Sequence, residues 1–358
     1  MKGRGVLRKS IEIVSAILFK FERLLIGKMN VPQTLSIQLD LTNACNLRCT
    51  HCYHKEHLPK NEMSFEQWMS VLNAYDGLRI RLGKDPSILF CGGEPLLSEH
   101  FFPVLDAVRA RWPGCPIAIL SNGTLIGPKL FDDKNLANLH FQISFDGVDA
   151  ATHDCVRGVG SFERSIAGAG YLRARGVPFS FQAVLSKRTS HFIPSFFTLA
   201  QTLGASEMNF ARMVAVGNAA ELMAHGADAP LEGEVLRVAL IAILEASKRT
   251  SIPTNTAKPL FNIIDPTIGA PQYLGFQGIV VDPSGNMKVS SRTPTVLGNV
   301  LVDGLEKTFL RHEVMVGLRA GKIEGCANCA HFRKCGGDRN VAFAKTGSYF
   351  TKDPGCWL

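Results

Sequence analysis

The sequence contains no apolar run long enough to cross a membrane. A candidate near the N-terminus, the mostly apolar run Ile13 to Phe19, ends at Lys20 and is soon followed by Glu22 and Arg23. A membrane-spanning helix needs about 20 consecutive apolar residues, and the run is also too short and too closely followed by charge for a signal peptide. Ten cysteines without a signal peptide indicate a reducing compartment, where disulfides are rare. We therefore expect a cytoplasmic protein.

Internal repeats, low-complexity tracts and interleaved aromatic and basic residues are also absent beyond the N-terminal segment. The net charge of +8 could indicate nucleic acid or anionic lipid as a partner. Much of this charge falls in the first thirty residues, at Lys2, Arg4, Arg8, Lys9, Lys20, Arg23 and Lys28. We therefore expect no nucleic-acid-binding surface.

The first 33 residues are predicted to carry one amphipathic, basic helix, at residues 7–26. Its apolar face repeats at helical spacing through Ile11, Val14, Leu18, Phe21 and Leu25. We interpret it as a helix that caps the domain or packs on a partner. The alternative is a peripheral membrane-surface helix.

A fourth cysteine is missing from the first cysteine group. Cys45, Cys49 and Cys52 have the spacing C-x3-C-x2-C, just after a strand-like run. Four thiolates complete a [4Fe–4S] cluster, so three leave one iron open to bind a substrate. A disulfide framework would need an even number of cysteines. The remaining alternative is a zinc site, with a fourth ligand from His51, His54 or His57.

Strand-like and helix-like segments alternate from residue 34 onward. Such alternation predicts an α/β fold with a parallel sheet and right-handed crossovers. The expected strands are residues 34–41, 87–91, 116–120, 140–145, 179–185 and 207–210. The expected helices include residues 64–82, 102–111, 162–175 and 194–203.

Four further motifs follow the cysteines in order. They are Cys91-Gly92-Gly93-Glu94-Pro95, Ser121-Asn122-Gly123-Thr124, Ile143-Ser144-Phe145-Asp146-Gly147 and a segment that opens at Arg157-Gly158. Together with the cysteine loop, this series resembles the radical S-adenosylmethionine (SAM) enzymes. The resemblance implies a partial (β/α)6 barrel of the TIM type at residues 34–214, with its site at the carboxyl ends of the strands.

The resemblance also implies the cofactors and their ligands. Cys45, Cys49 and Cys52 would hold a [4Fe–4S] cluster whose open iron chelates SAM. A low-potential donor of the flavodoxin or ferredoxin type would supply the electron for reductive cleavage to a 5′-deoxyadenosyl radical, which then abstracts hydrogen from the substrate. The residues implied in SAM binding are His51, Gly92, Gly93, Glu94, Asn122, Ser144 and Arg157.

A second cysteine group lies near the C-terminus. Cys326, Cys329, Cys335 and Cys356 are similar to part of the SPASM extension of peptide-modifying radical SAM enzymes. Ser290 and Arg339 stand where that extension has further cysteines, so we expect one auxiliary [4Fe–4S] cluster instead of two. A zinc ion bound by the same four cysteines is the alternative. The extension would span residues 278–358, with a hairpin at 278–289 and a helix at 305–317, and a helical, Pro-rich linker would span residues 215–277.

The sequence leaves the substrate open. The extension favours a ribosomally made peptide or a protein side chain. Only about 33 residues precede the expected barrel, so we expect that a leader peptide would need a separate partner protein or another docking surface. The alternatives are a small molecule, such as a sugar, amino acid or lipid-like precursor, and a non-catalytic iron–sulfur protein. The intact SAM motifs argue against the last of these.

No residue is assigned as a catalytic acid, base or radical relay. Cys155, Tyr273 and Asp338 are candidates only. Cys115 is expected to be a buried free thiol, and packing is also the favoured interpretation of Cys91 and Cys155.

Overall fold

The computed structural model describes residues 33–55, 57–132, 135–269 and 278–358. The predicted helix at residues 7–26 and the candidate Tyr273 lie outside them. Residues Thr34–Leu358 form one compact unit. In the part of the chain that is described, no helix is long and apolar enough to span a membrane.

The described residues form a nine-stranded sheet in the order β6-β5-β4-β3-β2-β1-β7-β8-β9. Neighbours from β6 to β7 are parallel, whereas β8 and β9 pair antiparallel. The six predicted parallel strands are confirmed, each within two residues. The strands are β1 (Thr34–Asp40), β2 (Asp85–Cys91), β3 (Ile117–Ser121), β4 (Leu139–Ser144), β5 (Phe179–Leu185), β6 (Met208–Arg212), β7 (Gly278–Val281), β8 (Asn286–Lys288) and β9 (Val296–Asn299).

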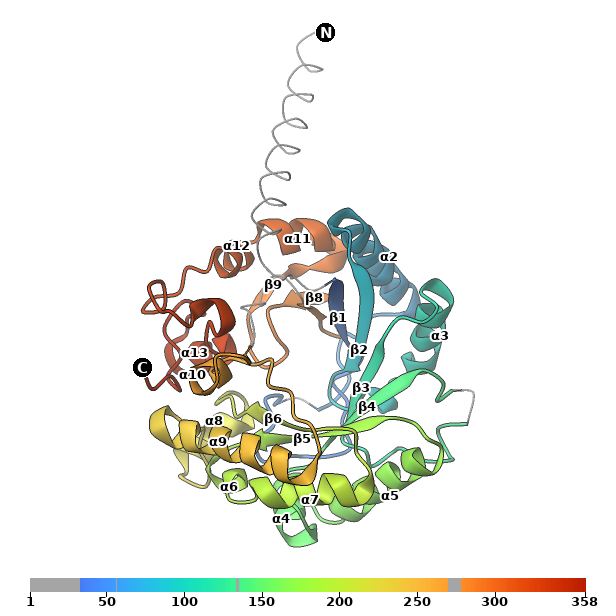
Figure 1. The fold of residues 1–358 in the computed structure, drawn as a ribbon. Coiled ribbons are helices and arrows are strands. Elements are labelled where there is room, and N and C mark those ends of the chain that lie inside the picture. The colour runs from blue at the N-terminus through green and yellow to red at the C-terminus, as the bar shows by residue number, and fades with distance from the viewer. Residues whose placement is uncertain (1–32, 56, 133–134, 270–277) are drawn as a thin grey trace, which may run out of the picture. The chain divides into compact units, whose positions relative to one another are not determined.

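Helices lie around the outside of the curved sheet, which makes the fold a partial TIM-type barrel (Figure 1). Within the barrel they are α2 (Phe65–Leu82), α3 (Phe101–Arg111), α4 (Ala150–Arg157), α5 (Ser161–Ala174), α6 (Lys187–Ser190) and α7 (Ile193–Leu203), with the short 3-10 helix η1 (Pro95–Leu97). After β6 come α8 (Asn218–Ala224), α9 (Gly233–Thr250), α10 (Phe261–Ile264), α11 (Leu305–Arg311), α12 (Glu313–Arg319) and α13 (Arg339–Thr346), with the short π-helix η2 (Val300–Gly304) and the 3-10 helix η3 (Phe332–Lys334).

The alternation of buried residues separates the two faces of the sheet. In β1, Leu35, Ile37 and Leu39 are fully buried, and the Tyr75 hydroxyl of α2 donates to the carbonyl of Leu35. Successive strand residues point to opposite faces, so Gln38 lies on the concave side, where it bonds to other polar groups. The outer face of the sheet therefore packs against the helices in the apolar core, and the concave face carries polar side chains.

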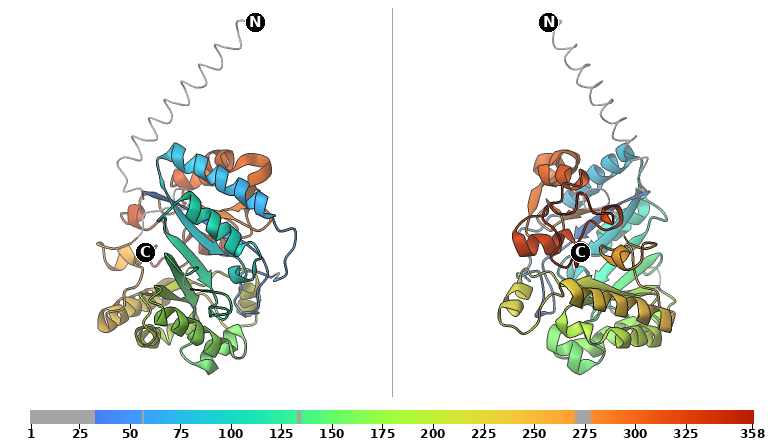
Figure 2. Two further views of the ribbon diagram at one scale, coloured as in Figure 1. Left: turned by 90° about the vertical axis from the view of Figure 1, so that its right-hand side faces the viewer. Right: turned by 60° about the vertical axis from the view of Figure 1, so that its left-hand side comes forward.

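Local signals set the ends of α2, which lies beside α3 on the outer face of the sheet (Figure 2). Ser64 and Gln67 form a reciprocal capping box at its start. Gly83 ends the helix with a left-handed backbone, at φ 63°.

One helix prediction needs correction, and one crossover lacks a helix among its described residues. The predicted helix at 305–317 is two helices, because His312 adopts an extended backbone (ψ 132°) and accepts a hydrogen bond from Val314 N on its ring. Moreover, the described residues between β3 and β4 contain turns and no helix, so this crossover departs from the strict (β/α)6 pattern.

The residues after β6 connect the barrel to its C-terminal part. Helix α9 packs against α7, and Met208 N donates to the carbonyl of Pro253, so the chain after α9 returns along the edge of β6. Strand β7 then pairs with β1 and begins the predicted hairpin with β8. The C-terminal strands therefore continue the barrel sheet beyond β1.

Candidate functional site

The predicted site residues gather where the parallel strands end. The loop with Cys45 follows β1, Gly92 and Gly93 follow β2, Asn122 follows β3 and Ser144 ends β4. Carboxyl ends of parallel strands share one edge of a sheet, which explains how segments nearly one hundred residues apart meet.

Backbone contacts from three directions hold the cysteine loop. Thr50 N donates to the carbonyl of Val156 in α4 (2.9 Å), and Cys45 N donates to the carbonyl of His57 (3.4 Å). Asn218 N, at the start of α8, donates to the carbonyl of Cys52 (2.8 Å). These hydrogen bonds tie the backbone of the cysteine loop to α4, to the segment at His57 and to the start of α8.

Gly92 and Gly93 allow the chain to pack against itself. A Cβ on Gly92 would lie 2.4 Å from the carbonyl oxygen of Thr42, and one on Gly93 would lie 2.4 Å from that of Ala44. Gly93 N also donates to the carbonyl of Thr42 (2.8 Å). The close approach that these glycines permit is to the segment that leads into Cys45.

Glu94 is fully buried and holds the end of β3. Its carboxylate accepts hydrogen bonds from the Ser121 hydroxyl (2.9 Å), Asn122 N (2.8 Å) and Leu96 N (3.3 Å). Burial raises the pKa of Glu94 to about 7, although these bonds oppose the shift. Only part of its acceptor capacity remains for a ligand.

Asp146 links two predicted SAM-site residues and was not singled out as a site residue from the sequence. Its Oδ2 accepts from Arg157 Nε (2.6 Å) and contacts His51 Nε2 (2.7 Å), while Oδ1 accepts from Val184 N (2.8 Å). Burial alone would raise the pKa of Asp146, but Arg157 and His51 hold it well below its usual range. Arg157 Nη1 also lies 3.9 Å from Cys49 Sγ.

Asn122 connects β3 to the cysteine loop. Its amide nitrogen donates to Asn46 Oδ1 (2.9 Å), and Asn46 donates in turn to the Thr124 hydroxyl (2.8 Å). Ser144 is half-buried and pairs in register with Gln182 of β5. Ser144 and Asn122 therefore end adjacent strands.

The three cysteines fit an iron–sulfur cluster by their chemistry. All are free thiols, and burial raises the pKa of Cys52 to about 11, so metal binding must displace protons. Arg157 supplies a nearby positive charge for the resulting thiolates. In the described part of the chain, no three histidine, cysteine or carboxylate side chains converge on a single metal-ion position. The predicted zinc alternatives gain no support from this geometry, whereas a cube spreads its ligands over several iron atoms.

The C-terminal cysteines also meet. Cys335 Sγ accepts from Leu260 N (3.3 Å) and Gly337 N (3.4 Å). Burial raises the pKa of Cys326 and of Cys335. The charges of Cys329 and Cys356 add to the shift at Cys326, and the charge of Cys356 adds to the shift at Cys335. All four are free thiols, and of the four it is Cys335 whose sulfur accepts from backbone donors in the described part of the chain.

A polar cluster that sequence analysis did not identify lies on the concave face of the sheet. Gln38 Nε2 donates to Asp40 Oδ1 (2.7 Å), and the Ser291 hydroxyl donates to Asp40 Oδ2 (2.8 Å). Tyr53, next to Cys52, donates to the Cys91 thiol. These groups place hydrogen-bonding side chains below the cysteine loop.

Asp40→Asn is expected to remove part of the pH dependence of stability. Burial raises the pKa of Asp40 to about 6, so between about pH 4 and 6 the folded protein keeps a proton that the unfolded chain loses. Stability therefore falls as pH rises through this range, by up to about 3 kcal/mol. Urea unfolding from pH 4 to 7 should give a flatter curve for the variant. Glu94 leaves a slope of the same sign in both proteins, and parallel curves would contradict the assignment.

Two of the catalytic candidates from the sequence, Cys155 and Asp338, lie among the described residues. Cys155 is exposed, so the packing role favoured from the sequence is wrong for this residue, and its sulfur accepts from Arg188 Nη1 (3.2 Å). Asp338 caps the N-terminus of α13 through Asn340 N and Val341 N. Cys115 is buried, as expected.

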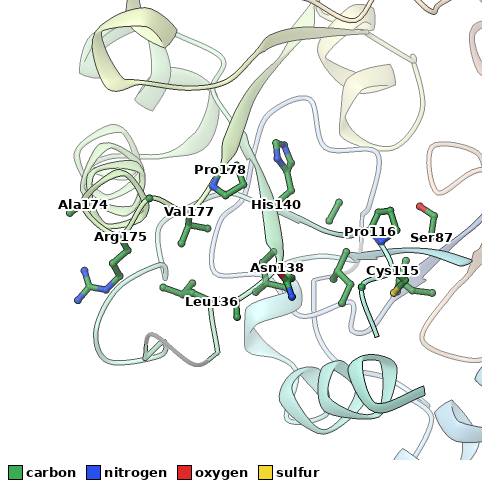
Figure 3. A pocket seen from close by; sticks show the side chains of 17 residues that line it. Ser87, Cys115, Pro116, Leu136, Asn138, His140, Ala174, Arg175, Val177 and Pro178 are labelled. Atoms are coloured by element: carbon green, nitrogen blue, oxygen red, sulfur yellow. The ribbon is translucent and has the colours of Figure 1, made fainter. Parts of the chain in front are cut away.

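A cavity of about 1040 Å³ lies at the opposite ends of the strands (Figure 3). It is lined by the segments around Cys115, Asn138 and Val177, which precede β3, β4 and β5, and by His140 at the start of β4. None of the predicted site residues lines it. The cavity is thus separate from the candidate site.

The fold and the loop of three cysteines define a radical SAM domain. Residues 39–190 match the Radical SAM superfamily. This part of the chain is therefore a radical SAM domain, for which a [4Fe–4S] cluster and SAM are the implied cofactors.

The chain is similar to enzymes of different kinds and to a solved structure of the same fold. An AdoMet-dependent heme synthase from Methanosarcina barkeri is 28% identical over 93% of this chain and 98% of the relative. A PqqA peptide cyclase from Xanthomonas campestris is 31% identical, over 51% of this chain and 47% of the relative. Streptococcus suis SuiB, solved with its precursor peptide SuiA, has the same fold, with a TM-score of 0.71 over 94% of this chain and 79% of that chain at 17% identity.

Proposed function

We propose that this enzyme generates a 5′-deoxyadenosyl radical and removes a hydrogen atom from a carboxylate-bearing small molecule of the tetrapyrrole class. The observation that carries the proposal is that three features lie together at one edge of the barrel. They are the cysteine loop, Glu94, and Asp146 with its partners His51 and Arg157. When bound, the cluster and SAM supply the electron and the radical.

The residues around the cysteines would position SAM. Arg157, fixed by Asp146, offsets the thiolate charge at Cys49. Ser144 and Asn122 offer polar groups from adjacent strand ends, and His51 is oriented by Asp146. Glu94 holds the end of β3 and keeps one acceptor position for the ammonium group of SAM.

A group of cations beside β6 supports an anionic substrate. Lys258 Nζ donates to the carbonyl of Phe210 (2.7 Å), and Arg292 Nη1 donates to the carbonyl of Arg212 (3.5 Å). Burial and then the charge of Arg292 lower the pKa of Lys258 to about 8. An incoming carboxylate would relieve the repulsion between these two cations.

The coverage of relatives supports the tetrapyrrole class over a peptide. The heme synthase aligns along nearly the whole chain, whereas the peptide cyclase aligns along about half. The peptide expected from the sequence remains a second candidate, because SuiB shares the fold and was solved with a peptide.

We also propose that Cys326, Cys329, Cys335 and Cys356 hold an auxiliary [4Fe–4S] cluster. Four ligands would leave no iron open, so this centre would carry electrons or staple the C-terminal part. A low-potential flavodoxin or ferredoxin would be the donor. The basic N-terminal segment would contact a partner protein or a membrane surface.

Iron coproporphyrin III, a tetrapyrrole that carries carboxylates, serves as the probe of this class. Lys258→Gln is expected to weaken its binding by about 10- to 100-fold, because a partly buried charged hydrogen bond is lost. A Soret titration measures this affinity. Lys345→Gln is the matched control, since Lys345 pairs with Glu232 on the surface. Equal affinities for the two variants would remove Lys258 from the substrate site.

The function is tested by 5′-deoxyadenosine formation in anaerobic protein with SAM and reductant. We expect iron coproporphyrin III to stimulate it and to be altered in mass, while its tetramethyl ester does neither. Stimulation by a peptide instead would move the assignment to the second candidate.

A further inference from the structure

Arg339 is buried with an unused hydrogen-bond donor. Its side chain is 1% exposed, and Nη1 donates to the carbonyls of Tyr349 (2.9 Å) and Thr351 (2.6 Å). Nη2 is buried without a partner. A charged group rarely leaves such a donor unpaired, because desolvation is costly.

Arg212 repeats the arrangement from the end of β6. Its Nη1 donates to Asp353 Oδ2 (2.6 Å), and its Nη2 is buried without a partner. Asp353 also accepts from Asp338 N (2.6 Å) and Gly355 N (2.7 Å). Asp338 adds a second negative charge near both guanidinium groups, yet Nη2 of each arginine keeps a donor without a partner.

The free donor of Arg339 lies among the C-terminal cysteines. A Cβ on Gly337 would be 2.4 Å from Arg339 Nη2, and Gly337 N itself donates to Cys335 Sγ. Arg339 also exerts its charge on the thiol of Cys326. After the carboxylate of Asp353, the thiols of Cys326 and Cys335 are among the groups whose negative charge would act on Arg339.

We propose that Arg339 is a positioning residue that donates Nη2–H to the thiolate of Cys326 or Cys335 when the four cysteines hold their metal centre. This inference rests on the proposed auxiliary centre. Four thiolates leave either a zinc ion or a [4Fe–4S] core with net negative charge, which needs compensation in a buried site. Arg339 supplies it directly, and Arg212 supports the same region through Asp353.

The test uses full-length protein in which Cys45, Cys49 and Cys52 are alanine, so that only the C-terminal centre is observed. In this background, Arg339→Gln should release metal to a chelator at least tenfold faster than the parent. If the metal is iron, one-electron reduction should become about tenfold less favourable, which is about 59 mV. Arg339→Lys should fall between the two.

Arg319→Gln is the matched control, because Arg319 donates to the carbonyls of Phe309 and Leu310 but lies on α12. It should release metal at the parent rate. If Arg339→Gln releases metal at a rate within twofold of the parent rate, the proposal is overturned. Failure of that variant to load metal supports it if its metal-free form melts like the parent, and overturns it if folding is lost as well.

A parent that takes up no metal overturns the auxiliary centre and this role of Arg339 together. The radical chemistry proposed for the first cluster would be unaffected, since it is measured separately as 5′-deoxyadenosine in the enzyme with Cys45, Cys49 and Cys52 intact.

Discussion

Replacing Cys49 with alanine is expected to reduce 5′-deoxyadenosine formation to the background of the assay. With Cys45 and Cys52 alone, one more iron of the cube would lack a protein ligand. The loss of Cys49 also removes the sulfur beside Arg157 Nη1, so a buried guanidinium would face no thiolate. The measurement is nucleoside per chain over time after anaerobic reconstitution.

Cys155→Ala is the control for this variant. Cys155 is an exposed free thiol on α4, and its sulfur contacts Arg188 instead of the cysteine loop. It should keep the parent rate and iron content. Reductive SAM cleavage at the parent rate by Cys49→Ala would show that this cysteine is no cluster ligand.

Asp146→Asn is expected to lower the free energy of unfolding by about 3–5 kcal/mol, because it leaves buried Arg157 without its carboxylate. An amide cannot substitute here. Oδ1 accepts from Val184 N and Oδ2 accepts from Arg157, so the amide NH₂ would face a donor in either orientation. The same variant should lose SAM cleavage, because His51 and Arg157 would no longer be fixed.

Urea unfolding of the metal-free proteins measures this effect separately from cofactor loading. Asp132→Asn is the control, since Asp132 is exposed and accepts one backbone hydrogen bond, from Asn135 N. Surface changes of this kind typically stay within about 0.5 kcal/mol. If the free energy of unfolding fell by the same small amount in both variants, Asp146 would not be the residue that fixes His51 and Arg157.

The barrel was predictable because its strands carry strong local signals. In β1, apolar Leu35, Ile37 and Leu39 alternate with polar residues, and Ser64 with Gln67 marks the start of α2. The break between α11 and α12 was not predictable from the sequence. His312 caps α12 through its own ring, and no glycine or proline marks the position.

Some residues of the candidate site could be predicted from the sequence, and others could not. Cys45, Cys49 and Cys52 are close in sequence, so their spacing alone indicated the cluster. Asp40 becomes notable only through Ser291, which lies 251 positions away in the sequence. The internal role of Glu94 depends likewise on strands that meet only in the fold.

The most direct test of the open iron is the electron paramagnetic resonance spectrum of the reduced protein with and without SAM. We predict that SAM changes the signal of the cluster at Cys45, Cys49 and Cys52. 5′-Methylthioadenosine should leave it unchanged, because it lacks the amino and carboxylate groups that would bind the iron. A spectrum that SAM does not alter, in protein with the cluster fully loaded, would contradict the account.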